Sequence, residues 1–291
     1  MRGLGRIGEP PATLAAGAAP RTPRRGRGVR QRGTGRLLGA LGAVAILLAL
    51  LGAWELYADL GPVDPLLLPA PHAVARALWI DRALLWTNLR VTAGEVLLGV
   101  LVAGGAGFAC AVALHLSLSL RRSTYPLLVA SQTIPIPLIA PLLVVWLGFG
   151  IGPKLVIIGL ISFFPIVVTT LDALGRVDSE TIKLLRTLDA SRLRILRHVE
   201  LPAALPGLLS GAKVAVTVAV IGAVFAEVFG GSSSGLGNVV QYAIPNLRTD
   251  RAYAAVLLLS AFAIALFGLL TLAERLLVPW AHDRSPEGRT R

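Results

Sequence analysis

The chain has 291 residues, of which 55% are hydrophobic and only 15% charged, and its formal net charge is +12. Several apolar runs are near twenty residues long, which excludes an ordinary soluble domain and predicts an all-α protein that crosses a membrane several times. The single Cys110 excludes an internal disulfide. Lysine occurs only at positions 154, 183 and 213, never after a glycine, so the chain carries no phosphate loop of an ATPase.

Six apolar spans are predicted, at residues 37–57, 91–116, 124–147, 154–174, 212–230 and 254–278. Arginines gather before the first span, between the second and third spans, before the fifth span and at the chain end. Because cytoplasmic segments carry an excess of Lys and Arg, both termini are predicted to be cytoplasmic, which agrees with an even number of spans.

The domain organisation follows from these spans. We predict a disordered Arg-rich cytoplasmic tail over 1–36, a first transmembrane anchor over 37–58, an extracytoplasmic connector over 59–90, a five-helix core over 91–278 with a cytoplasmic loop at 175–211, and a cytoplasmic tail over 279–291. No aromatic residues interleave the arginines of the first tail, so nucleic acid is not an expected partner. Attraction to anionic membrane lipid is the expected role of its charge.

The connector begins with a Pro-rich stretch and continues into a short amphipathic pattern. Val74, Leu78 and Trp79 recur at helical spacing, which predicts a short helix at the membrane interface.

Span two contains two rows of small residues, many of them four positions apart: Gly99, Ala103 and Gly107 in the first, and Gly104 and Gly105 beside Ala109 and Ala113 in the second. Such rows let helix backbones approach closely, so a packing face is predicted. Glu95 lies in the same apolar run, where a carboxylate is costly and needs a partner or water. Two interpretations stay open for it: lining of a translocation path, or a hydrated structural position beside Arg90.

Span three contains Pro126, Pro135, Pro137 and Pro141, and each proline removes a backbone donor. The helix is therefore predicted to kink or unwind, which a membrane tolerates where protein or a water-filled cavity satisfies the freed groups. Three polar residues precede the break, so the candidate path residues here are Ser131, Gln132, Thr133, Pro135 and Pro137. The alternative is a kinked packing helix without a transport role.

The stretch from Arg176 to Pro206 is charged but keeps helical periodicity. Its apolar residues recur at three- and four-residue steps, and basic residues cover much of the remaining surface. The pattern predicts a basic amphipathic helical pair that lies on the membrane face or docks in a groove of a partner protein.

Glu227 lies near the outer end of span five, before the sequence Ser-Ser-Ser-Gly-Leu-Gly that ends at Gly237. The two glycines allow a tight backbone course. Glu227 is predicted either to organise this outer segment by accepting hydrogen bonds or to meet solute or a binding protein. His72, His115, His198 and His282 are scattered without paired spacing, so neither a metal site nor a catalytic site is predicted.

The segment from Lys183 to Pro202 resembles the "EAA" loop of permease subunits of binding-protein-dependent ABC importers. That pattern ends in Leu-Pro, here Leu201 and Pro202, and its conserved glycine position is taken by Asp189. Asp is among the few non-glycine residues that visit the left-handed region. Lys183, Leu184 and Leu185 stand where the family has Glu-Ala-Ala, which is a departure. The Gly-Leu-Gly turn and the terminal Val-Pro-Trp at 278–280 support the resemblance.

The resemblance implies a type I ABC importer permease fold with six transmembrane helices in a bacterial plasma membrane. It implies that ATP and magnesium are bound by a separate dimer of ATP-binding subunits, that an extracytoplasmic solute-binding protein delivers cargo, and that a second copy of the chain completes the path. No cofactor is expected in this chain. The residues that would contact the ATPase are Lys183, Leu184, Leu185, Arg186, Leu188, Asp189, Ala190, Arg192, Leu193, Leu196, Leu201 and Pro202.

Within the family, the chain is most similar to the nitrate, sulfonate and taurine branch. Phrases such as Ala-Val-Ile-Gly-Ala and Gly-Leu-Gly resemble the group that carries hydroxymethylpyrimidine, a thiamine precursor, so a pyrimidine-type solute is the expected cargo. A sulfonate, taurine or nitrate importer is the alternative. A different class, a membrane scaffold that contacts an ATPase without transport, stays open because of the altered loop head; a membrane-embedded enzyme is disfavoured because no catalytic site can be assembled.

Overall fold

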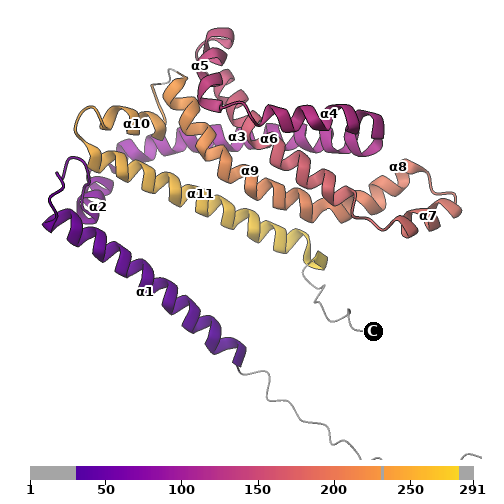
Figure 1. Ribbon diagram of the computed structural model, residues 1–291, viewed down its shortest axis with the longest axis horizontal. Coiled ribbons are helices and arrows are strands. Elements are labelled where there is room, and N and C mark those ends of the chain that lie inside the picture. Colours follow the sequence, from indigo (N-terminus) through magenta and orange to yellow (C-terminus); the bar gives the residue numbers. More distant parts are fainter. Residues whose placement is uncertain (1–30, 231–232, 282–291) are drawn as a thin grey trace, which may run out of the picture. The chain divides into compact units, whose positions relative to one another are not determined.

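The computed structural model describes residues 31–230 and 233–281, and these form helices joined by short connections (Figure 1). The chain divides into two compact units, residues 1–52 and 53–291, and all predicted site residues lie in the second. The elements are α1 (Gln31–Leu60), α2 (Pro71–Ile80), α3 (Arg82–Leu116), α4 (Leu118–Ser131), α5 (Ile136–Leu147), α6 (Ile151–Leu174), α7 (Ser179–Thr187), α8 (Arg192–Ile195), the π-helix η1 (Leu196–Glu200), α9 (Leu201–Phe229), α10 (Leu236–Ala243), α11 (Thr249–Leu277) and the 3₁₀-helix η2 (Pro279–Ala281).

The number of predicted spans is confirmed. Five helices of the described chain are long and apolar enough to cross a membrane, and the pair α4 and α5 makes a sixth span if the two are counted together. This pair is bent by 99° at the break that the prolines of span three predict. The sidedness of the termini stays a prediction.

The boundaries of the elements differ from the predicted ones. Helix α1 already begins at Gln31, so residues 31–36 are helical rather than disordered; residues 1–30 and 282–291 of the predicted tails lie outside the described residues. Helix α3 begins at Arg82, inside the predicted connector, because the helix continues past the apolar stretch. The predicted short amphipathic helix is confirmed as α2, which begins with Pro71 and buries Val74 and Ala77.

The core of the second unit is built from α3, α6 and α9, which pack against one another (Figure 1). The first small-residue row of span two is confirmed as a packing face, because Gly99 lies against Ile158 and Gly107 against Ile166. The second row is not packed within the described chain: a side chain at Gly104 or Gly105 would meet nothing within 4 Å.

The close approach of α9 to α6 depends on Gly211. A Cβ atom at this position would lie 3.1 Å from the Pro165 carbonyl oxygen and 3.2 Å from the Ile166 Cα, and would collide with the Thr169 hydroxyl. Backbone atoms cannot move aside as a side chain does, so a larger residue at this position would push α9 away from α6.

We therefore expect Gly211→Ala to lower the free energy of unfolding by about 1–3 kcal/mol, the usual cost of overpacking a core. The matched control is Gly268→Ala on α11, where a Cβ would meet nothing within 4 Å. The apparent Tm of both variants in detergent would be compared with the parent. An unchanged Tm for Gly211→Ala would contradict the packing of α6 on α9.

Candidate functional site

The loop at 175–211, called the coupling loop below, begins with a well-capped helix. Asp178 precedes α7, and its carboxylate accepts hydrogen bonds from the backbone N–H groups of Glu180 (3.2 Å) and Thr181 (3.3 Å). These donors stabilise the charged form, so they hold the pKa of Asp178 below its usual value. Helix α7 buries none of its residues and is held by this cap and by the turn that follows it.

The turn between α7 and α8 is made at Asp189, which has a φ of 57°. The expectation that Asp189 adopts the left-handed conformation at the family's glycine position is confirmed. The N–H of Ala190 closes the helix by donating to the carbonyl of Leu185 at 3.0 Å. The Ser191 hydroxyl then caps α8 by accepting from the N–H of Arg194.

The outward surface of the coupling loop is apolar and is flanked by basic residues. Leu184 and Leu188 are 62% and 70% exposed, although they lie outside every candidate span. Leu193 is 71% exposed and lies at the beginning of the candidate span Arg192–Phe229. Lys183 and Arg186 are exposed beside them. Large apolar side chains that are exposed outside the spans, here Leu184 and Leu188, indicate a surface that another protein covers.

Two predicted contact residues are engaged within the chain. Leu196 is buried with Ala173 and Ala204. The Arg192 guanidinium donates to the carbonyls of His115 and Leu116, so it is engaged within the chain. The prediction that Leu196 contributes to the outward face is corrected, whereas Arg192 is exposed and its guanidinium is bound to the end of α3. The remaining residues of the predicted set divide as follows: Leu185, Ala190 and Leu201 are half-buried, and Asp189 and Pro202 are exposed.

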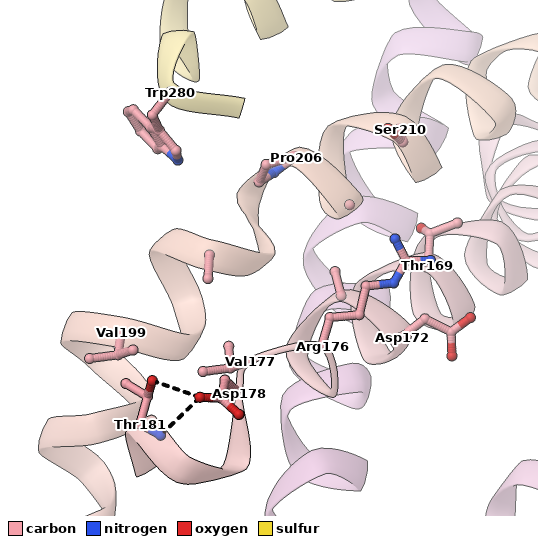
Figure 2. A pocket seen from close by; sticks show the side chains of 13 residues that line it. Thr169, Asp172, Arg176, Val177, Asp178, Thr181, Val199, Pro206, Ser210 and Trp280 are labelled. Atoms are coloured by element: carbon pink, nitrogen blue, oxygen red, sulfur yellow. Dashed lines mark hydrogen bonds between the residues drawn. The ribbon is translucent and has the colours of Figure 1, made fainter. Parts of the chain in front are cut away.

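A cavity of about 750 Å³ lies behind α7, between the end of α6 and the beginning of α9 (Figure 2). Its polar lining includes Asp172, Arg176, Asp178 and Ser210, and Trp280 also lines it. Since α7 buries no residue of its own, this space leaves room for α7 to shift without unpacking the core.

The break between α4 and α5 carries the predicted polar path residues. The Ser131 hydroxyl donates to the Leu128 carbonyl at 2.7 Å, and the Thr133 hydroxyl donates to the Ala130 carbonyl at 2.8 Å. These bonds satisfy carbonyls near the break, where the helix ends. Gln132 is also exposed there.

The two prolines named for the path lie at the start of the second half of the bent pair. Pro135 precedes α5 as its N-cap residue, and Pro137 lies in the first turn, where a missing N–H costs nothing. Pro135 is exposed and Pro137 is half-buried. The five residues between 131 and 137 that were predicted to line the path therefore all lie at the bend between α4 and α5.

Glu227 lies elsewhere, fully buried between α9, α3 and the turn formed by Gly235, Leu236 and Gly237, called the outer turn below. Its carboxylate accepts from the Thr92 hydroxyl at 2.6 Å and from the Gly237 N–H at 2.5 Å. The Thr92 oxygen in turn accepts from the N–H of Leu236 at 2.9 Å. This geometry agrees with the interpretation that Glu227 organises the outer turn.

Both glycines of the outer turn are required by this carboxylate. Gly235 has a φ of 111°, and a Cβ there would overlap the carboxylate of Glu227. A Cβ at Gly237 would lie 2.8 Å from the same carboxylate. The N–H of Gly235 also donates to the side-chain oxygen of Asn88 at 2.7 Å, so α3 holds the turn at a second point.

Glu95 is buried and forms an ion pair with Lys154 of α6, with 2.5 Å between Nζ and Oε1. The predicted partner Arg90 is wrong: its guanidinium lies over the ring of Trp86, 6.0 Å from the centroid. The sequence analysis missed Lys154 because the ion pair spans 59 positions of the chain. A lysine next to an apolar span, opposite a span that contains a lone carboxylate, is the signal that could have found it.

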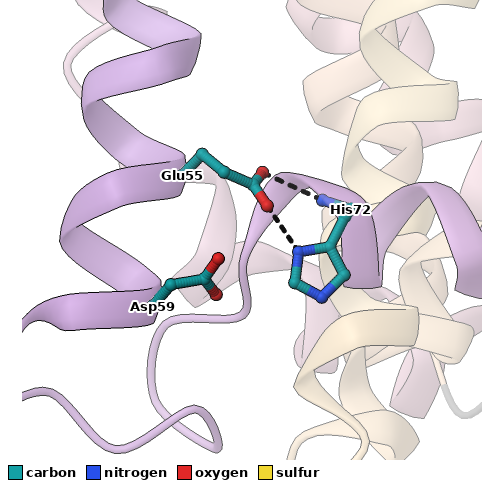
Figure 3. Close-up of side chains that lie close together, drawn as sticks. All are labelled: Glu55, Asp59 and His72. Atoms are coloured by element: carbon teal, nitrogen blue, oxygen red, sulfur yellow. Dashed lines mark hydrogen bonds and ion pairs between the residues drawn. The ribbon is translucent and has the colours of Figure 1, made fainter.

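A third polar group joins the end of α1 to α2 (Figure 3). The Glu55 carboxylate contacts the His72 ring nitrogen Nδ1 at 2.5 Å and accepts from the His72 backbone N–H at 3.2 Å. Asp59 lies close enough that one ligand atom from each of the three residues falls within 4.8 Å of the others. Both oxygens of Glu55 already contact His72, so we interpret the group as a clamp between two helices.

Substitution of Thr92 tests whether its hydroxyl holds the outer turn in place. Thr92→Val removes one of the two donors to Glu227 and leaves the N–H of Leu236 without its acceptor, which we expect to cost about 1–3 kcal/mol. Hydrogen exchange of the outer turn should accelerate while the core of α6 stays protected. Thr271→Val, which removes an exposed hydroxyl bonded within its own helix, is the matched control. Unchanged exchange in the turn would contradict the account of Glu227.

The ion pair between Glu55 and His72 is expected to depend on pH. Hydrogen bonding to Glu55 raises the pKa of His72 above 6.5, so the ion pair is complete below pH 6.5 and is lost as the pH rises through the raised pKa. Histidine-labelled protein followed by NMR should show this raised pKa. Glu55→Gln should lower it markedly, and Asp59→Asn should lower it less because Asp59 contributes less. A His72 pKa that does not respond to Glu55→Gln would refute the pairing.

Comparison with known proteins agrees with this geometry. Residues 97–281 match the family described as "Binding-protein-dependent transport system inner membrane component". A probable ABC transporter permease protein of Haemophilus influenzae is 39% identical over 232 residues, which cover 80% of this chain and 93% of that protein.

Two further relatives are named for heterocyclic cargo. The formylaminopyrimidine transport permease ThiX of Halalkalibacterium halodurans is 32% identical over 83% of this chain and 96% of its own length. The riboflavin transport permease RibX of Chloroflexus aurantiacus is 33% identical over 83% of this chain and 90% of its own length. Permeases named for aliphatic sulfonates and taurine also match, so these relatives include the sulfonate and taurine branch.

Among solved structures, a chain of the inward-facing MetNI methionine ABC transporter aligns with a TM-score of 0.52 at 22% identity, over 69% of this chain and 95% of that one. The fold is therefore that of a type I ABC importer permease. Its apolar helices place it as a multi-pass protein of the bacterial plasma membrane. The chain belongs to the family of inner-membrane permeases of binding-protein-dependent transport systems.

Proposed function

We propose that this ABC permease subunit forms half of the translocation path of an ATP-driven importer and that a second copy forms the other half. ATP and magnesium are bound by separate ATP-binding subunits, and an extracytoplasmic solute-binding protein delivers the cargo. The observation that carries the proposal is the exposed apolar and basic surface around Leu184 and Leu188, which lies outside the spans in a family of transport permeases. Such a surface fits a groove on a partner subunit.

The proposed mechanism joins the coupling loop to the bent helix pair. Closure of the ATP-binding subunits moves α7, for which the cavity behind it leaves room. Helix α6, which ends just before the coupling loop, also packs against α5, so this motion reaches the break at Ser131, Gln132 and Thr133. These polar residues line the path, whereas Glu95 and Glu227 are buried and paired, and stabilise its walls.

We propose a pyrimidine-type vitamin precursor as cargo. The relatives named for formylaminopyrimidine and riboflavin support a hydrogen-bonding heterocycle. The uncharged hydroxyl and amide groups of Ser131, Gln132 and Thr133 suit such a solute better than an anion. A sulfonate, taurine or nitrate is the second candidate, supported by the relatives named for aliphatic sulfonates and taurine.

The test is ATP-dependent uptake by the permease in proteoliposomes, together with its ATP-binding subunit and binding protein. Labelled hydroxymethylpyrimidine compounds would be compared with taurine and alkanesulfonates. Uptake of the heterocycle supports the proposal, and uptake of a sulfonate keeps the importer but replaces the cargo. ATP hydrolysis without uptake of any solute that the binding protein holds would favour a non-transporting scaffold.

In the same assay, Leu188→Asp should lower uptake by at least about tenfold, because a charge in an apolar contact costs more than about 1.4 kcal/mol. The variant should still insert in the membrane, since Leu188 is 70% exposed. Leu188→Met, which keeps an apolar side chain of similar volume, is the control and should transport normally. Normal uptake by Leu188→Asp would exclude Leu188 from the docking surface.

A further inference from the structure

The last turn of α3 is tied to the second half of the coupling loop at two points. Helix α3 ends at Leu116, where the final backbone carbonyls have no partner within the helix. The Arg192 guanidinium of α8 donates to the carbonyl of His115 at 3.3 Å and to that of Leu116 at 3.2 Å. A cation at a helix C-terminus is favourable both as a donor and by its charge.

The second point is a hydrogen-bond contact made by a side chain of the same turn. His115 Nε2 lies 3.0 Å from a carboxylate oxygen of Glu200, and both side chains are largely buried. Glu200 is the last residue of the π-helix η1, and the next residue begins α9. A π-helix inserts an extra residue into a helical turn, and such insertions are frequent at functional sites. Its first and last residues, Leu196 and Glu200, are both buried.

The far end of α3 holds the outer turn. Asn88 and Thr92, near the beginning of the helix, accept from the N–H groups of Gly235 and Leu236. Helix α3 runs without interruption over 35 residues, which corresponds to about 50 Å at 1.5 Å per residue. One rigid element therefore contacts the coupling loop at one end and the outer turn at the other.

We propose that Arg192, His115 and Glu200 form a transmission joint, through which movement of the coupling loop is passed to α3 and along it to the outer turn. This inference rests on the proposed function, because it assigns the route by which an ATPase-driven movement reaches the opposite side. The three residues are positioning residues: they contact each other and the helix end, and act on the cargo path through α3. Without the joint, α8 can move while α3 stays in place.

The test uses the full complex in proteoliposomes with the double variant Arg192→Met, Glu200→Ala. Its ATP-binding subunits should still assemble and hydrolyse ATP, but cargo taken up per ATP should fall by about fivefold or more, the lower end of usual coupling effects. Arg122→Met, an exposed arginine on α4, is the matched control and should stay within about twofold of the parent. Parental uptake per ATP in the double variant would overturn the proposal.

A structural readout separates the joint from transport itself. Spin labels at Leu101 on α3 and Arg197 on η1, both exposed, would be introduced after Cys110→Ala. With the joint intact, the distance between the labels should be narrow and equal with and without ATP. In the Arg192→Met, Glu200→Ala variant, the distribution of this distance should broaden, or the distance should change when ATP is added.

Unchanged distances in that variant would overturn the joint even if transport fell for another reason, such as loss of stability. If the parent complex hydrolyses ATP but moves no solute, the proposed function fails, and the spin-label distances alone then decide whether the joint exists.

Discussion

The hydrogen bond between Thr92 and Glu227 is the constraint on which much of the second unit depends. A carboxylate buried among membrane helices is costly unless hydrogen bonds satisfy it. Glu227 finds donors on α3 and in the outer turn, so burying it fixes α9, α3 and that turn together. The same carboxylate occupies the space that a side chain at Gly235 would need. Position 235 must therefore remain glycine, and the turn has little freedom to take another course.

The close packing of α3, α6 and α9 makes this arrangement a block rather than a set of separate spans. Small residues bring the helices together, and the Glu95–Lys154 pair joins α3 to α6 within the same block. The coupling loop contrasts with it, because α7 buries no residue and lies beside a cavity. A loosely held helix attached to a rigid block is suited to receive a movement from outside and to pass it on.

Features that depend on residues close together in the sequence could be predicted from local patterns. Periodicity predicted the spans and α2, prolines predicted the bend of 99°, and the family pattern predicted the left-handed Asp189. Contacts between distant segments could not be predicted in this way. Lys154 partners Glu95 from another helix, and Arg192 contacts a helix end 76 positions earlier. Leu196 was assigned to the wrong face because its burial depends on contacts with Ala173 and Ala204, which lie on other helical turns of the fold.

The most direct test of this account is a pair of experimental structures of the complete transporter, without nucleotide and with ATP bound. The account predicts that α3, α6 and α9 superpose as one block in both, with the Thr92 hydroxyl still bonded to Glu227, while α7 shifts relative to that block. A state in which the Thr92–Glu227 bond is broken and the outer turn separates from α3 would contradict it.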